Sequence, residues 1–249
     1  DSLAIDISPN NDNRPFAAQM GLWKNLSFDK DARLLPYEFR GFPLTKMIVV
    51  IIILVVLVLI FPITLIPYLK KGPGLSLNHY AYFAIIGFAY MSVELILMQQ
   101  FTLLVGPSTY SVAAILMTLL ITSGIGSRYS STFESKMVFL AIISWLFLDI
   151  ALFKYFVLLF GDFEQSVRIA ATIILVSPLG FFMGMPFPKG VRHVGPLVDW
   201  SFAVNGAASV LGSTMTILMV ISWGFSFGLT IGLLSYATAG LLMWKNSPD

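Results

Sequence analysis

Long apolar runs separated by short polar stretches dominate this chain from about residue 47 onward. A helix needs about 20 predominantly apolar residues to cross the hydrocarbon core of a bilayer, which is roughly 30 Å thick. Each run is close to this length, so the pattern predicts seven transmembrane helices. They are expected near residues 47–69, 80–104, 108–127, 136–160, 166–188, 200–222 and 224–244.

Composition supports a bilayer as the solvent of these helices. Hydrophobic residues make up 57% of the chain and charged residues 11%, whereas a soluble protein of average composition carries about 25% charged residues. The mean hydropathy is +0.84. We therefore predict an all-α, polytopic membrane protein with a seven-helix transmembrane domain over residues 46–249. Residues 1–45 form a polar N-terminal arm or linker, too short and too rich in turn-forming residues to build its own core.

The positions of lysine and arginine predict the orientation of the chain, because short cytoplasmic loops carry an excess of both. Seven basic residues fall on the face shared by the first, third and fifth connections and the C terminus, against two near the other face. The seven are Lys70, Lys71, Arg128, Lys136, Lys189, Arg192 and Lys245. We thus expect a membrane protein with a cytoplasmic C terminus. The arm is then extracytoplasmic, although its own basic residues favour the opposite side.

Polar side chains within the apolar runs are the candidate intramembrane site. A carboxylate at membrane depth costs at least about 2.5 to 3.5 kcal/mol, so Glu94 should face protein or water. The other candidates are Gln99, Gln100, Asp149 and Asn205. We expect a hydrogen-bond donor for Glu94 from Asn205, Gln99 or Arg128. A buried network that fixes the helix register is one role for these groups, and a proton or cation relay is the alternative.

A helix break is predicted in the fifth apolar run at Gly184, Pro186 and Pro188, because a flexible residue is followed there by two prolines. Such a break can line an ion or substrate site. It is equally consistent with a helix end at the membrane interface. Gly180 and Gly184 also form a step of two small residues that favours close helix packing.

Several kinds of chemistry are excluded or disfavoured. The chain has no cysteine, which rules out disulfides, thiolate zinc sites, iron–sulfur clusters and covalently attached c-type haem in these residues. The two histidines, His79 and His193, lie near basic loops and do not suit haem ligation between facing helices. We expect no cofactor, no metal site and no nucleic-acid partner, and the lipid bilayer as the principal surroundings.

Three blocks of the sequence resemble a known family of bacterial membrane proteins. The blocks are GFAYMSVELILMQQFTLLVGPSTYSVAAILMTLLITSGIGS, SPLGFFMGMPFPKGVR and WSFAVNGAASVLGS. They are similar to spermidine synthase-like fusion proteins, in which a Rossmann domain of the propylamine-transferase type precedes transmembrane helices. The segment SPNNDNRPF also looks like the end of that synthase-like domain. The resemblance implies that this chain is the C-terminal membrane half, in a bacterial inner membrane, with an upstream Rossmann-like domain as its partner.

The nucleotide-binding motif of such a domain does not occur in this sequence. No glycine-rich turn is followed by an acidic ribose ligand, so no catalytic residue is assigned and we do not expect this chain alone to be an enzyme. Three function classes remain: a membrane anchor or scaffold, an accessory structural subunit of a larger membrane complex, and a transporter or channel that uses Glu94, Asp149 and Asn205. S-adenosyl donors are cytoplasmic, which conflicts with an extracytoplasmic upstream domain.

Overall fold

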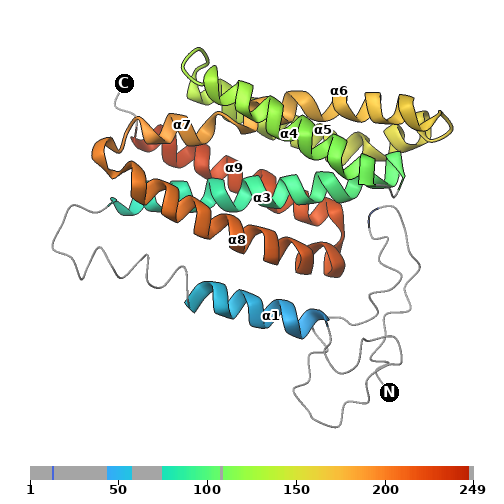
Figure 1. Cartoon of the computed structure of the whole chain (residues 1–249). Helices are drawn as coiled ribbons and strands as arrows, with labels where there is room; N and C mark the ends of the chain where they lie inside the picture. The colour runs from blue at the N-terminus through green and yellow to red at the C-terminus, as the bar shows by residue number, and fades with distance from the viewer. Residues whose placement is uncertain (1–12, 14–43, 58–74, 107–108, 247–249) are drawn as a thin grey trace, which may run out of the picture.

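The computed structural model describes residue 13 and the ranges 44–57, 75–106 and 109–246, and its regular elements there are all helical. The helices lie side by side along one long direction (Figure 1). The α-helices are α1 (Leu44–Val55), α3 (Leu77–Val105), α4 (Thr109–Arg128), α5 (Ser135–Phe160), α6 (Gln165–Met183), α7 (Pro186–Val191), α8 (Val198–Trp223) and α9 (Phe225–Asn246), and the short 3-10 helix η4 covers Gly195–Leu197. The prediction of an all-α fold is confirmed for these residues.

Five helical stretches of the described chain are long and apolar enough to cross a membrane. They are Leu77–Val105, Ser135–Phe160, Gln165–Val191, Gly195–Trp223 and Phe225–Trp244. The apolar part of α4, Val112–Arg128, is shorter, and residues 58–69 of the first expected span lie outside the described residues. The architecture is that of a membrane-embedded helical protein, while the full count of seven spans stays a prediction.

Glycines with a positive φ end two of the helices. Gly106 follows α3 with a φ of 104° and Gly224 separates α8 from α9 with a φ of 86°. Each glycine still donates its N–H to the last turn, to the carbonyls of Thr102 and Val220 respectively, both at 2.8 Å. Side chains with a Cβ rarely adopt such φ values, so glycine allows the chain to reverse within a few residues.

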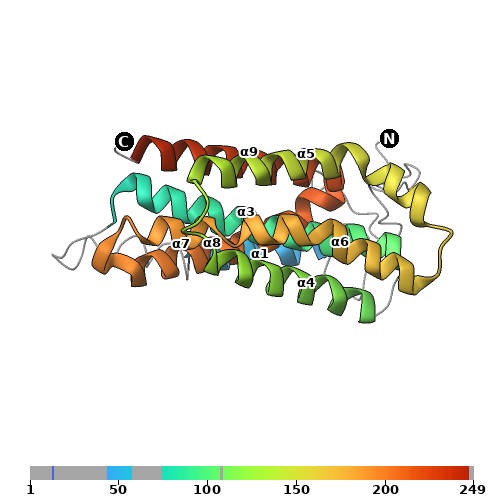
Figure 2. The same ribbon diagram turned by 90° about the horizontal axis from the view of Figure 1, so that it is seen from above.

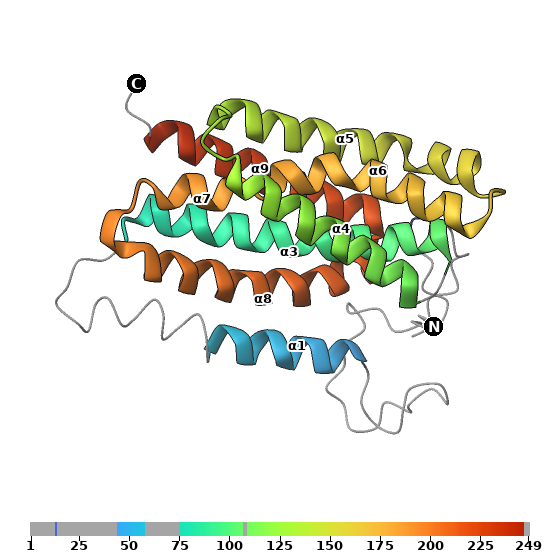
Figure 3. The same ribbon diagram turned by 45° about the horizontal axis from the view of Figure 1, so that its top comes forward.

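Helix α3 occupies the centre of the bundle and contacts α8, α9, α4 and α6. In Figures 2 and 3, α8 and α9 lie on opposite sides of it. Its apolar window is 56% buried, against 33–39% for the other four spans. Phe83, Val93 and Ile96 are fully buried along it. The polar residues Ser92, Glu94 and Gln100 of α3 are buried within the bundle, which makes this helix a candidate carrier of an internal site.

Small residues let helix backbones touch at two interfaces. A Cβ added at Gly126 of α4 would overlap the backbone oxygen of Phe181 in α6, and one added at Gly184 would overlap the oxygen of Ser123. Between α3 and α8, Gly87 is held in the same way against the backbone of Asn205. Helices in lipid associate through such close approach because hydrophobic expulsion cannot drive them together.

Basic side chains bind the α4–α5 connection to α7. Lys189 donates its Nζ to the carbonyl of Phe133, and Arg192 donates Nη2 to the hydroxyl of Ser130 at 3.2 Å.

Asn13 of the N-terminal arm contacts the first turn of α9. Its side-chain oxygen accepts hydrogen bonds from the N–H and hydroxyl of Ser226, at 2.7 and 2.9 Å. Asn13 of the N-terminal arm and the C-terminal end of α9 therefore lie at opposite ends of the bundle.

Candidate functional site

The chain leaves the helix at the predicted break. Helix α6 ends at Met183, the backbone turns through Gly184 and Met185, and α7 begins at Pro186. The hydroxyl of Tyr82 in α3 donates to the carbonyl of Pro186 at 2.6 Å, and this hydrogen bond is buried. Irregular backbone at membrane depth must be satisfied by protein or water. The tyrosine meets that requirement for one carbonyl of the break.

We expect the substitution Tyr82→Phe to lower the free energy of unfolding by about 1 kcal/mol, because a buried carbonyl loses its side-chain donor while the ring still fills its place. Reversible unfolding of the purified protein in mixed micelles measures the change. Tyr80→Phe, on the preceding part of the same helix, is the matched control and should have no effect, since Tyr80 is only partly buried. Equal stability of the two variants would contradict the role given to Tyr82.

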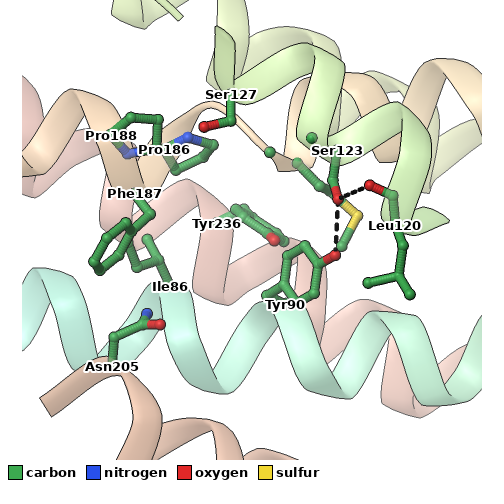
Figure 4. A pocket seen from close by; sticks show the side chains of 13 residues that line it. Ile86, Tyr90, Leu120, Ser123, Ser127, Pro186, Phe187, Pro188, Asn205 and Tyr236 are labelled. Carbon is green, nitrogen blue, oxygen red and sulfur yellow. Dashed lines mark hydrogen bonds between the residues drawn. The ribbon is translucent and has the colours of Figure 1, made fainter. Parts of the chain in front are cut away.

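A cavity of about 320 Å³ lies beside this break. Figure 4 shows its lining side chains, which come from α3, α4, α8, α9 and the segment around the break. The lining residues are Ile86, Tyr90, Leu120, Ser123, Gly124, Ser127, Met183, Gly184, Pro186, Phe187, Pro188, Asn205 and Tyr236. None of these residues is charged. The three residues of the expected helix break and Asn205 thus belong to one concave site.

Tyrosine and serine hydroxyls supply most of the polar groups in the cavity. The hydroxyl of Tyr90 donates to Ser123 Oγ at 3.2 Å, and Ser123 in turn donates to the carbonyl of Leu120 at 3.2 Å (Figure 4). Tyr236 of α9 is 1% exposed, and its hydroxyl has no hydrogen-bond partner within the described part of the chain. The lining therefore includes one hydrogen-bonded hydroxyl pair and, at Tyr236, a buried hydroxyl without a partner among the described residues.

Asn205 links α8 to α3. Its side-chain Nδ2 donates to the carbonyl of Phe83 at 3.1 Å, and one turn later Ser209 donates to the carbonyl of Gly87 at 3.2 Å. The sequence made Asn205 a candidate donor for Glu94, but the structure shows that it donates to a backbone carbonyl of α3 instead. The Asn205 side chain also lies at the edge of the cavity in Figure 4.

Glu94 is placed apart from the donors expected for it. It is 8% exposed, and no hydrogen bond joins it to Asn205, Gln99 or Arg128 among the described residues. Asn205 binds near Phe83, eleven residues before Glu94, which corresponds to about 16 Å along the helix axis. Tyr90 and Tyr236 are two ionisable side chains that interact electrostatically with Glu94. Glu94 therefore lies close to two cavity tyrosines without lining the cavity itself.

Two further candidates meet at a second site, between α3 and α5. Gln100 donates its Nε2 to Asp149 Oδ2 at 3.2 Å, and the two side chains are 2% and 7% exposed. One turn further along α3, the carbonyl of Leu104 accepts a hydrogen bond from Arg168 of α6 at 3.1 Å. The sequence named Gln100 and Asp149 separately and gave no indication of their pairing.

The candidate residues therefore divide among three places. Asn205 and the helix break belong to the cavity, Gln100 and Asp149 form a buried pair, and Glu94 lies between the helices near Tyr90 and Tyr236. Gln99 is only partly buried and belongs to none of the three places. Tyr82, Tyr90 and Tyr236 were not singled out from the sequence. An uncharged phenol costs little free energy at membrane depth, so a tyrosine within an apolar run does not indicate a site. Among the described residues, no three His, Asp or Glu side chains are grouped to hold a metal ion.

Comparison with protein families, with curated proteins and with solved structures finds no match to this chain.

Proposed function

We propose that this chain is the integral membrane domain of a spermidine synthase-like protein and that it serves as a membrane anchor or scaffold. The observation that carries the scaffold role is the backbone contact between paired helices. Gly126 and Gly184 hold α4 against α6, and Gly87 holds α3 against α8. Backbones at this distance cannot slide past each other without separating, so the bundle presents a fixed surface on which another domain can be mounted.

The arrangement of the polar residues supports a scaffold over a transporter or channel. A transport path needs its ionisable groups along one continuous cavity. Of the three residues proposed for such a path, only Asn205 lines the cavity, and Asp149 is paired with Gln100 elsewhere in the bundle. An accessory subunit of a larger complex would need the same rigid core. The structure therefore does not distinguish this alternative from the scaffold, and an experiment must.

Mass mapping of the native protein tests the proposal. We expect peptides of a Rossmann-type domain that precede Asp1 in one polypeptide, because the resemblance places a synthase-like domain there. An intact native mass near 27.5 kDa, the mass of this chain, would overturn the fusion and favour an independent subunit.

The orientation is tested with single cysteines, since the chain has none of its own. Asp162, between α5 and α6, and Thr132, between α4 and α5, are both exposed. In intact cells we expect a membrane-impermeant maleimide to label Asp162→Cys, and to label Thr132→Cys only after permeabilisation, because basic residues surround the latter connection. The reverse pattern would mean that the C terminus is extracytoplasmic, and an upstream domain would then face cytoplasmic S-adenosyl donors.

A further inference from the structure

We propose that the cavity beside the helix break binds the ring of a neutral, lipid-soluble quinone. This binding site goes beyond the scaffold role. It is built from residues of four long helices and of the break, and its volume of about 320 Å³ falls at the lower end of the roughly 300–1,000 Å³ range of small-molecule pockets.

The lining selects an uncharged ligand. Every described residue that lines the cavity is apolar or carries a neutral hydroxyl or amide group. An ion would lose its hydration there without contacting an opposite charge in the lining, which is costly in a medium of low dielectric constant. A neutral molecule with a few oxygen atoms loses little, because its oxygens can accept hydrogen bonds from the hydroxyls.

The cavity can be reached from the lipid side of α4. Leu120 at its edge is 59% exposed, and Gly124, one turn further along, is exposed as well. A Cβ added at Gly124 would meet no atom within 4 Å, so the helix surface beside the cavity is open at this point. A ligand dissolved in the hydrocarbon layer can therefore approach without crossing the bundle.

The unsatisfied hydroxyl of Tyr236 identifies the chemistry of the missing partner. A buried hydroxyl without a partner is destabilising, and a phenylalanine would fill the same space without that cost. A carbonyl oxygen of a ligand accepts from this hydroxyl, and the planar ring of a quinone packs against the aromatic side chains of Tyr90 and Phe187. Figure 4 shows the Tyr236 ring among the lining side chains, between Tyr90 and the Pro186–Pro188 segment.

The test uses the full chain in lipid nanodiscs and equilibrium dialysis with radiolabelled 2-methyl-1,4-naphthoquinone. The matched probe is 2-methylnaphthalene, which has the same rings and methyl group without the oxygens. We expect the quinone to bind more tightly than the hydrocarbon. Tyr236→Phe should weaken quinone binding about tenfold, the effect of one hydrogen bond, and should leave hydrocarbon binding unchanged.

Two glycine variants separate the cavity from the rest of the surface. Gly124→Trp places an indole at the opening and should abolish quinone binding. Gly206→Trp is the control, because a Cβ at Gly206 also meets open space and Gly206 does not line the cavity; its quinone affinity should equal that of the unmodified chain. The thermal midpoint of each variant is measured alongside, so that a folding defect is recognised as such.

Three results would overturn the proposal. The first is a quinone affinity no greater than that of 2-methylnaphthalene. The second is unchanged quinone binding in a folded Gly124→Trp variant. The third is a phospholipid that co-purifies with the unmodified chain, is absent from Gly124→Trp and is not displaced by the quinone, since the cavity would then hold a lipid instead. None of these results depends on the mass of the native protein, so the quinone proposal and the scaffold proposal are tested independently.

Discussion

Replacing Gly126 with alanine is expected to lower the free energy of unfolding by about 3 kcal/mol, the upper part of the usual range for overpacking. The added methyl group would overlap the backbone oxygen of Phe181. Side chains can rotate away from such a contact, whereas a carbonyl held in helix α6 cannot. The two helices must separate, and the hydrogen bond from Tyr90 to Ser123 would be strained with them. Reversible unfolding in mixed micelles measures the loss.

Gly124→Ala provides a control only two residues away on the same helix. There the new methyl group meets open space, and the substitution should stabilise the helix by about 0.5 to 1 kcal/mol through reduced backbone entropy of the unfolded chain. The two alanine variants should thus change stability in opposite directions. Equal effects would show that α4 and α6 are not in backbone contact.

The second large effect is expected at the buried pair between α3 and α5. Gln100→Leu removes the donor that reaches Asp149 and leaves a carboxyl group 7% exposed without that partner. Gln100 Oε1 is itself buried without a partner among the described residues, so the substitution also removes one unsatisfied atom. We therefore expect the free energy of unfolding to fall by about 1.5 kcal/mol, the upper part of the usual net contribution of one hydrogen bond. The same unfolding assay in mixed micelles measures it.

The double variant Gln100→Leu/Asp149→Val tests whether this loss comes from the pair. With both polar groups replaced by apolar side chains, nothing is left unsatisfied, and the stability should return to within about 0.5 kcal/mol of the unmodified chain. The single variant Asp149→Val completes the comparison. If the loss of stability in the double variant equalled the sum of the losses in the two single variants, the pair would not interact. If Asp149 also served in a proton relay, the double variant would regain stability but would lose the relay function, because it lacks the carboxyl group.

The apolar pattern predicts the helices well because bilayer thickness leaves few choices of length. The expected span at 136–160 corresponds to α5 at Ser135–Phe160, and the expected span at 224–244 corresponds to α9 at Phe225–Asn246. Helix ends follow from Gly106 and Gly224, whose residue type is readable in the sequence. The break after Met183 is equally readable, because the prolines and Gly184 have strong local effects on the backbone.

The partners of the polar residues could not be predicted, because they depend on how helices rotate and slide against one another. Asn205 and Glu94 are both conspicuous in the sequence, yet the register of α8 on α3 places Asn205 beside Phe83. The pairing of Gln100 with Asp149 likewise depends on the position of α5. Tyr236 becomes conspicuous only when its hydroxyl is found without a partner. Local sequence rules contain no information on these distances.

The central position of α3 means that many of its contacts form only late in the synthesis of the protein. Its contacts with α8 join residues about 120 positions apart, such as Phe83 and Asn205, or Ser92 and the carbonyl of Gly212. A ribosome that adds 5–20 residues per second needs about 6 to 24 s to cover that interval. During this time α3 is already made, whereas α8 and α9, with which it makes most of its contacts, are not. The helix that carries Glu94 and Gln100 must therefore be sheltered by the insertion machinery or by temporary contacts until the last quarter of the chain is complete.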